Sequence, residues 1–341
     1  VVTEHRVHSE RWYIEEGHIP TGICVEAGQA DLFLSAYLGI DFVTRGRAVY
    51  RLLDATVTFH RDLPRPGELI RFDIHIDRFF RQGETHLFRF RFDGTVNGEP
   101  LLTMRDGCAG FFTAEELAAG RGIVQTALDR RPMPGKKPAD WQDLAPLGGV
   151  ESYSPVQLNE LRQGNLVGCF GDPFRACQRV EPLTLPGGML NLVHRVPHLD
   201  PRGGRYGLGC IRAEMDIHPD DWFLTCHFVD DMVMPGTLMY ECCLHTLRLF
   251  LLRLGWVGQR GCHSWQPVRG VRSQLKCRGQ VTAQTQTVTY EVSIKELGYG
   301  PEPYAVADAL MYADGKPIVE ITNMALRLVG ASREEMEQLC S

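Results

Sequence analysis

The sequence predicts an α+β protein in which one module, a long apolar helix followed by an antiparallel meander of strands, occurs twice. Two observations support this prediction. Short motifs recur at a nearly constant spacing, and the segments after each helix alternate apolar and polar residues as half-buried strands do. A chain of 341 residues is long enough for two such modules with a large core.

The repeat begins at the helices. Residues 20–26 match residues 235–241, so that Pro20 recurs as Pro235 and Glu26 as Glu241, 215 positions later in both cases. An apolar run that closes in a glycine follows each match, which predicts helices over 22–38 and 238–256. Helices that are apolar on most faces are surrounded by other elements, so we expect a sheet to wrap around each of them.

The strands follow in order. In the first copy, alternation predicts strands over 49–59, 68–79, 86–96 and 99–112. Residues 71–76 match residues 289–294 in the second copy. The pairs Asn97-Gly98 and Asp314-Gly315 are strong signals for two-residue hairpins, and they stand at equivalent places in the two copies.

These elements predict four regions along the chain. The N-terminal copy covers 1–120 and the C-terminal copy covers 181–330. Between them, residues 121–180 are rich in proline and lack periodicity, which predicts a linker with one short helix at 156–162. Residues 331–341 form a tail, either a short charged helix or a frayed end.

Composition narrows the class of partner. The net charge of −6 gives no electrostatic reason to bind nucleic acid or an anionic membrane. Eleven scattered cysteines without a Cys-x-x-Cys pair favour a reduced chain, so we expect a cytoplasmic location. The most apolar segment, 238–256, contains four ionisable side chains and is interpreted as a buried helix rather than a membrane span. The chain lacks an initiator methionine, which suggests that it is part of a longer protein.

The residues that point to chemistry surround the start of the second helix. His227 lies eight residues before Pro235, and Glu241 lies six after it. A helix that opens at Pro235 leaves the backbone N–H groups near Gly236 and Thr237 without intrahelical partners, so these groups could polarise a carbonyl oxygen. A histidine before this helix end and a carboxylate inside the helix could then act on an acidic C–H and a leaving hydroxyl.

The run from His227 to Glu241 resembles the signature of hot-dog 3-hydroxyacyl-[acyl-carrier-protein] dehydratases, in particular the dehydratase/isomerase type. Residues 19–31, 37–42 and 161–170 resemble the paired dehydratase domains of bacterial polyunsaturated fatty acid synthases; related polyketide synthases are left open as the parent. This resemblance implies a double hot-dog fold, with two antiparallel sheets each wrapped on a long central helix.

In that family each active site takes its histidine from one hot dog and its acidic residue from the other. The position of the first copy that is equivalent to His227 is Trp12, which cannot act as a base. The resemblance therefore implies one complete site, built from His227 and Glu26. Glu241 is the alternative acid, although we favour a structural role for it.

The resemblance also implies roles and partners. His227 would remove the α-proton of a 3-hydroxyacyl thioester, Glu26 would protonate the departing hydroxyl, and Gly236 and Thr237 would bind the thioester oxygen, with no metal and no organic cofactor. The expected partners are an acyl carrier protein bearing a phosphopantetheine-linked 3-hydroxyacyl chain and the other domains of the same synthase. The sequence leaves a homodimer open.

The sequence departs from the family pattern at two points, and it leaves two other functions open. Both copies have glutamate where the dehydratase/isomerase type has aspartate, which leaves double-bond isomerisation open, and Met232 replaces the family's proline. The alternatives are a hot-dog acyl thioesterase and a non-catalytic acyl-binding scaffold. The adjacent Cys242 and Cys243 point in different directions on a helix, so they do not predict a metal site.

Overall fold

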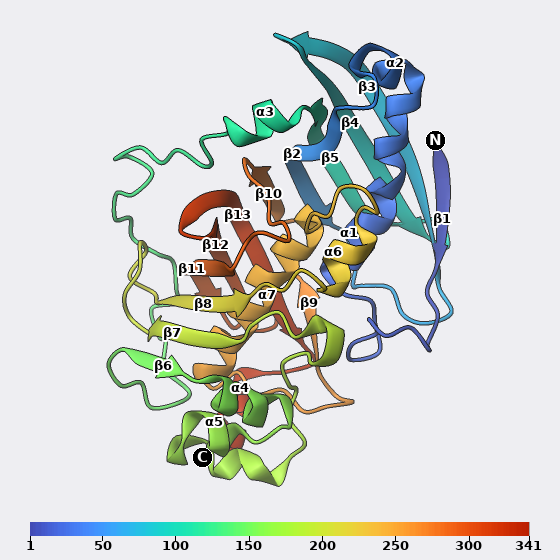
Figure 1. Cartoon of the computed structure of the whole chain (residues 1–341). Coiled ribbons are helices and arrows are strands. Elements are labelled where there is room, and N and C mark those ends of the chain that lie inside the picture. Colours follow the sequence, from blue (N-terminus) through green and yellow to red (C-terminus); the bar gives the residue numbers. More distant parts are fainter. Residues whose placement is uncertain (341) are drawn as a thin grey trace.

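The computed structural model describes residues 1–340. Its first half contains five strands that curve around one helical segment (Figure 1). Alternation explains the strands: in the third of the long strands, Phe88, Phe90 and Phe92 point into the core while the arginines between them face outward. The bounds are β1 (Val2–Arg6), β2 (Val49–Phe59), β3 (Leu69–Gln82), β4 (Thr85–Val96) and β5 (Glu99–Phe112).

The first helix differs from the prediction of one helix over 22–38. The α-helix α1 (Thr21–Gln29) gives way to a 3-10 helix, η1 (Ala30–Leu38), and a further turn, α2 (Ile40–Thr44), follows. An apolar repeat of three to four residues fits both helix types, so periodicity alone could not separate them. Gly39 ends η1 in a left-handed conformation.

The second half repeats the plan with a longer helix. Helix α7 (Gly236–Arg253) is buried on nearly all sides, and Gly255 ends it with a φ of 92°. The sheet that wraps around it consists of β7 (Arg195–Asp200), β8 (Cys210–Asp216), β9 (Ser264–Pro267), β10 (Arg272–Cys277), β11 (Thr287–Gly298), β12 (Tyr304–Ala313) and β13 (Lys316–Val329). The hairpins at Asn97-Gly98 and Asp314-Gly315 are confirmed: all four residues have positive φ.

The two halves share one sheet because β2 pairs antiparallel with β10, with Thr56 opposite Gln274. The same arrangement packs α1 against α7. Each half is a hot dog, and the predicted double hot-dog fold of class α+β is confirmed. The strand order is β1, β3, β4, β5, β2, β10, β13, β12, β11, β8, β7 and then β6 (Glu151–Tyr153), with β9 paired to β13.

Residues 121–180 hold more structure than the single helix predicted. Besides β6 they form α4 (Pro155–Arg162), α5 (Leu166–Phe170) and two 3-10 turns at 172–174 and 176–179. Leu158, Leu161 and Phe174 are fully buried in the core of the second half, so this segment closes one end of that core. The other short helices are α3 (Ala114–Ala118), α6 (Trp222–Cys226) and α8 (Arg333–Cys340). None of the helices within 1–340 is long and apolar enough to cross a membrane.

Candidate active site

Three of the predicted site residues line one pocket between the two halves. His227, Glu26 and Gly236 all face this catalytic pocket, which has an open volume of about 570 Å³. Glu26 comes from α1 in the first half, whereas His227 and Gly236 come from the second half. The two residues that the resemblance pairs, one from each half, therefore line the same pocket.

His227 follows the single turn of α6 and has a defined tautomer. Its Nδ1 lies 2.8 Å from the backbone oxygen of Val233. A carbonyl oxygen only accepts, so Nδ1 must carry the proton in this contact. The neutral ring then has its lone pair on Nε2, which is the nitrogen that remains available to take a proton.

Glu26 is held through one of its two oxygens. Its Oε2 accepts hydrogen bonds from Thr237 Oγ1 at 2.7 Å and from Gln29 Nε2 at 2.9 Å. Oε1 has no hydrogen bond with any of residues 1–340. The hydrogen bonds to Oε2 thus fix the carboxyl group, and they leave Oε1 available to bind a substrate. Thr237, whose backbone N–H was predicted to bind the thioester oxygen, lines the adjoining cavity instead of this pocket, and its hydroxyl donates to Glu26.

The N-terminus of α7 supplies a hydrogen-bond donor. Pro235 precedes the helix, and the Gly236 N–H has no acceptor within the described part of the chain. A methyl group on Gly236 would lie 3.5 Å from Leu52 and 3.6 Å from the sulfur of Cys277, so the backbone here is close to the pocket wall. A free N–H at a helix start is suited to bind a carbonyl oxygen that gains negative charge.

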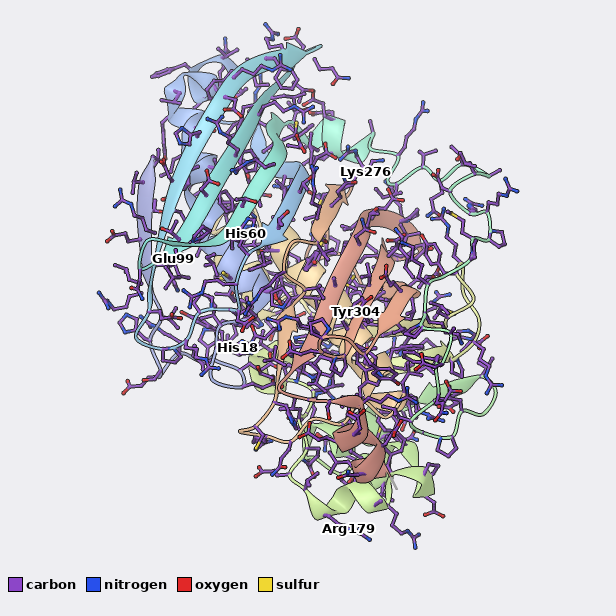
Figure 2. All side chains as sticks on the ribbon, turned by 180° about the vertical axis from the view of Figure 1, so that it is seen from behind. His18, His60, Glu99, Arg179, Lys276 and Tyr304 are labelled. Carbon is purple, nitrogen blue, oxygen red and sulfur yellow. The ribbon has the colours of Figure 1, made fainter. Side chains whose placement is uncertain are left out.

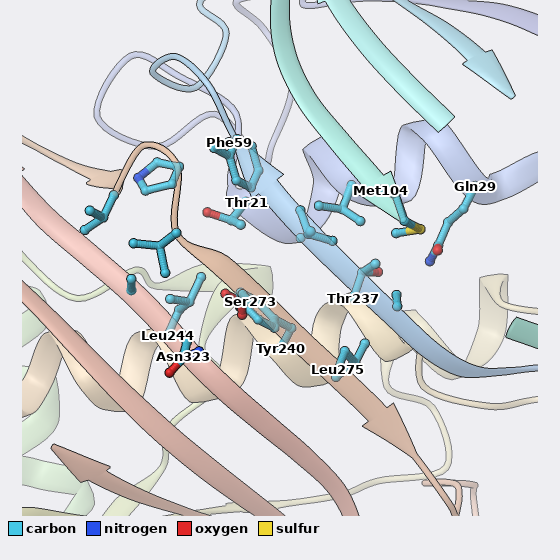
Figure 3. Close-up of a pocket in the computed structure, with 18 of the residues that line it drawn as sticks. Thr21, Gln29, Phe59, Met104, Thr237, Tyr240, Leu244, Ser273, Leu275 and Asn323 are labelled. Atoms are coloured by element: carbon cyan, nitrogen blue, oxygen red, sulfur yellow. Dashed lines mark hydrogen bonds between the residues drawn. The ribbon is translucent and has the colours of Figure 1, made fainter. Parts of the chain in front are cut away.

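A second cavity adjoins the catalytic pocket. It has an open volume of about 640 Å³ and shares Gln29 and Leu52 with the first pocket. Figure 3 shows that it runs between the two central helices and strands β2 and β10. Its lining is mainly apolar, and its polar pair Tyr240 and Ser273 is internally hydrogen-bonded at 3.0 Å. We call the second cavity the tunnel; Gln29 and Leu52 lie where it adjoins the catalytic pocket, which Glu26 lines.

Glu241 lies outside both cavities. It is 1% exposed, its Oε2 accepts a hydrogen bond from the Gly22 N–H at 2.7 Å, and its Oε1 lies 3.3 Å from His245 Nε2. Burial alone would raise the pKa of Glu241, but His245, Arg248 and the Gly22 N–H together bring it below 4.5. A buried carboxylate held in this way is a poor proton donor.

The surroundings of Glu241 form a buried polar cluster where the halves meet. Arg248 binds Glu15 at 2.5 Å, and Glu16 accepts from the Trp265 N–H at 3.1 Å. Burial and the neighbouring Glu15 raise the pKa of Glu16 to about 7. Burial also lowers the pKa of His18, whose Nε2 lies 3.9 Å from Glu16 Oε2. His18 is labelled in Figure 2.

The position equivalent to His227 in the first half carries no base. Trp12 is 45% exposed, and its ring contacts that of Trp222 edge to face, with 4.8 Å between centroids. The first half therefore supplies no histidine at the position equivalent to His227 with which Glu241 could pair.

Several pocket residues were not predicted. Gln29 stands three residues after Glu26, a spacing that puts both on one face of a helix, so this residue could have been found. Arg51, Cys277 and Gln280 also line the catalytic pocket, but no sequence motif marks them. No cluster of His, Cys, Asp and Glu that could hold a metal ion occurs among residues 1–340.

The chain is similar to known proteins, over part of its length for a family model and over most of it for a relative. Residues 185–322 match the family model of the FabA-like domain. The chain is 36% identical over 324 residues to a polyunsaturated fatty acid synthase polypeptide of Thraustochytrium sp.; the match covers 90% of the chain and 21% of that relative, so the chain spans about a fifth of the relative's length.

Among solved structures, an acyl-ACP thioesterase from Bacteroides thetaiotaomicron aligns with a TM-score of 0.46 and 9% identity, covering 96% of this chain and 97% of that one. The dehydratase domain from the CurJ module of curacin polyketide synthase aligns with a TM-score of 0.41 and 10% identity, covering 91% and 84%. The family match and the identity to the synthase polypeptide establish that this chain contains a FabA-like domain and is homologous to part of a polyunsaturated fatty acid synthase.

Proposed function

We propose that the chain is a 3-hydroxyacyl-[acyl-carrier-protein] dehydratase domain with a single active site, made of His227 and Glu26. The observation that carries this proposal is the shared pocket: a histidine with a free Nε2 and a carboxyl group with a free Oε1 reach it from opposite halves. An elimination of water needs both a base and an acid on one substrate.

The proposed reaction balances as a loss of water. Nε2 of His227 takes a proton from C2 of the 3-hydroxyacyl thioester, and the electron pair shifts toward the thioester oxygen. The Gly236 N–H stabilises that oxygen while it carries negative charge. The C3–O bond then breaks, the hydroxyl takes a proton from Glu26 Oε1, and a trans-2-enoyl thioester and water leave. Proton return from His227 to Glu26 completes the cycle.

The tunnel supports an acyl substrate. Beyond Gln29 and Leu52 the wall is mainly apolar, and its Tyr240–Ser273 pair is already hydrogen-bonded, so a hydrocarbon chain would leave few polar groups unpaired there. The proposal includes the partners and location expected from the sequence, which are an acyl carrier protein, the other domains of a synthase and the cytoplasm. The sequence left a homodimer open.

The test is mass spectrometry of 3-hydroxyacyl-acyl carrier protein incubated with the chain and with three variants. We expect the substrate to lose one water with the parent chain and with Glu241→Gln. We expect Glu26→Gln and His227→Ala to lose about 10²-fold or more in rate, because each removes a proton-transfer group. Glu241→Gln is the matched control, since it makes the same chemical change at the equivalent position.

Other outcomes would contradict the proposal. Full activity of Glu26→Gln would refute the crossed site, and activity lost only in Glu241→Gln would move the acid to the second half. Release of a free acid without a requirement for the 3-hydroxyl would identify a thioesterase. Absence of any reaction on short and long chains would indicate an acyl-binding scaffold.

A further inference from the structure

We infer that Arg51 of the first half is a positioning residue for His227 of the second half. This inference rests on the proposed function, because it concerns the same catalytic pocket. Arg51 lies on β2 at the pocket wall and binds Asp231, which belongs to the turn that follows His227. It is a two-bond ion pair between the half that carries Glu26 and the turn that follows the proposed base.

The guanidinium group of Arg51 is fully used. It makes two bonds to Asp231, Nη1 to Oδ2 at 2.5 Å and Nη2 to Oδ1 at 2.7 Å. Nε and Nη2 both donate to Gln280 Oε1, at 2.9 and 2.8 Å, and Nη1 also donates to the Tyr50 carbonyl at 2.7 Å. Arginine has five N–H donors, and all five are engaged here. It therefore has no donor left for a substrate phosphate or thioester.

The bonds of Asp231 lead directly to His227. The Phe228 N–H donates to the Asp231 carbonyl at 2.8 Å, and the Asp231 N–H donates back at 3.2 Å. Val233 closes the same turn twice: its N–H donates to the His227 carbonyl at 2.9 Å, and its own carbonyl accepts from the imidazole Nδ1. A shift of Asp231 would thus move the group that sets both the place and the tautomer of the imidazole.

Two other contacts restrain the turn: the ring centroid of Phe228 lies 5.3 Å from that of Phe33 in the first half, and Val233 forms a β-bridge with Thr282. Residues 227–233 lie between α6 and α7, outside any helix or strand, and Val229 is 82% exposed at the turn's tip. By contrast, the side chains of Arg51 and Asp231 are only 13% and 20% exposed. A two-bond arginine–carboxylate contact fixes direction as well as distance, so it is suited to anchor an otherwise exposed loop.

The chain offers a matched control in Arg278. This residue also makes a two-bond contact across the halves, from Nη2 to both oxygens of Asp54, at 2.8 and 3.1 Å. It also donates to two backbone carbonyls, those of Leu53 and Cys277. Its pair is more exposed, at 32% and 34%, and it does not contact the turn after His227. If activity falls only because the two halves hold together less well, it should fall in both Arg51→Ala and Arg278→Ala.

The activity test compares Arg51→Ala, Asp231→Asn, the double variant and Arg278→Ala. We expect Arg51→Ala to lower kcat by about 10²-fold with little change in KM, because a displacement of about 1 Å costs roughly that much. The double variant should be no slower than Arg51→Ala, Arg278→Ala should stay within about threefold of the parent, and added guanidinium should restore part of the activity of Arg51→Ala. Equal losses in the two arginine variants, additive losses in the double variant, or no loss in Arg51→Ala would overturn the inference.

A second measurement does not depend on activity. Diethyl pyrocarbonate modifies accessible imidazoles, and mass spectrometry of peptides reports the rate at His227. We expect this rate, and amide hydrogen exchange over 228–233, to rise at least severalfold in Arg51→Ala but not in Arg278→Ala. Unchanged rates would refute the positioning role even in a chain without dehydratase activity, whereas an inactive parent with raised rates in Arg51→Ala would refute only the proposed function.

Discussion

Replacement of Gly22 by alanine tests whether the spacing of the two central helices controls the active site. A methyl group at this position would lie 2.7 Å from the Thr237 carbonyl oxygen and 3.3 Å from Glu241 Oε2. The first contact is to backbone of α7, which cannot rotate away as a side chain could. Helix α1 would have to move away from α7, and it carries Glu26 one turn further along.

The size of the effect follows from three contributions. Alanine favours a helix over glycine by about 1 kcal/mol at most. Overpacking opposes this by about 1–3 kcal/mol. Any stretch of the 2.7 Å bond from the Gly22 N–H to Glu241 weakens a charge-assisted hydrogen bond worth about 1.5–3 kcal/mol. If the bond is lost, we therefore expect a net loss of about 1.5–5 kcal/mol in the free energy of unfolding.

Urea denaturation measures this loss as a lower transition midpoint with an unchanged slope. The dehydration rate should fall as well, because the Thr237–Glu26 bond at 2.7 Å joins the same two helices. Gly149→Ala is the control, since its added methyl group would meet nothing within 4 Å. A Gly22→Ala chain as stable and as active as the parent would show that the helix spacing does not constrain the site.

Two further predictions concern the pH dependence of stability and the acyl chain length of the substrate. The pKa of Glu16 is raised to about 7 from 4.5, so the stability contributed by its protonated form is complete below pH 4.5 and is lost as the pH rises to about 7. Glu16→Gln removes this titration, while Glu15, His18, Arg248 and Arg260 remain. The free energy of unfolding of the variant, relative to that of the parent, should therefore grow between pH 5 and 8, by about 3 kcal/mol at most. A difference that does not depend on pH in denaturation experiments would contradict the assignment. Val57→Phe narrows the tunnel, so kcat/KM should fall for a 3-hydroxyhexadecanoyl substrate and not for 3-hydroxybutyryl, whereas Thr58→Phe, on the opposite face of β2, should leave this ratio unchanged. Equal effects of both variants on both substrates would show that the acyl chain does not lie in this cavity.

The sequence predicts most of what depends on local pattern. Strands β2 and β5 have the predicted bounds, and both glycine hairpins stand where the Asn-Gly and Asp-Gly pairs put them. The repeat aligns Trp12 with His227, and the family resemblance then implied that His227 would pair with Glu26; both residues line one pocket. The strands and hairpins follow from period and turn chemistry, whereas the pairing of the two site residues needed the resemblance.

The remainder depends on contacts between the halves. The Arg51–Asp231 pair, the Gln29–Leu52 junction of the two cavities and the bond from Gly22 to Glu241 each join residues that the β2–β10 register brings together. Nothing local at Arg51 marks it, since an arginine on a strand more often faces solvent. The 3-10 helix at 30–38 was missed for a different reason, because its apolar spacing also fits an α-helix.

The continuous sheet across β2 and β10 has a consequence for how this site responds to dilution and to mutation. In a dimer of separate protomers, a site shared between chains forms only when the protomers associate, so the fraction of assembled sites depends on protein concentration. Here both contributors belong to one polypeptide, and their encounter is intramolecular. A symmetric dimer would also carry every substitution at both of its sites. In the single chain the two halves can change independently, so the first half could replace a histidine with Trp12 while the second half kept His227.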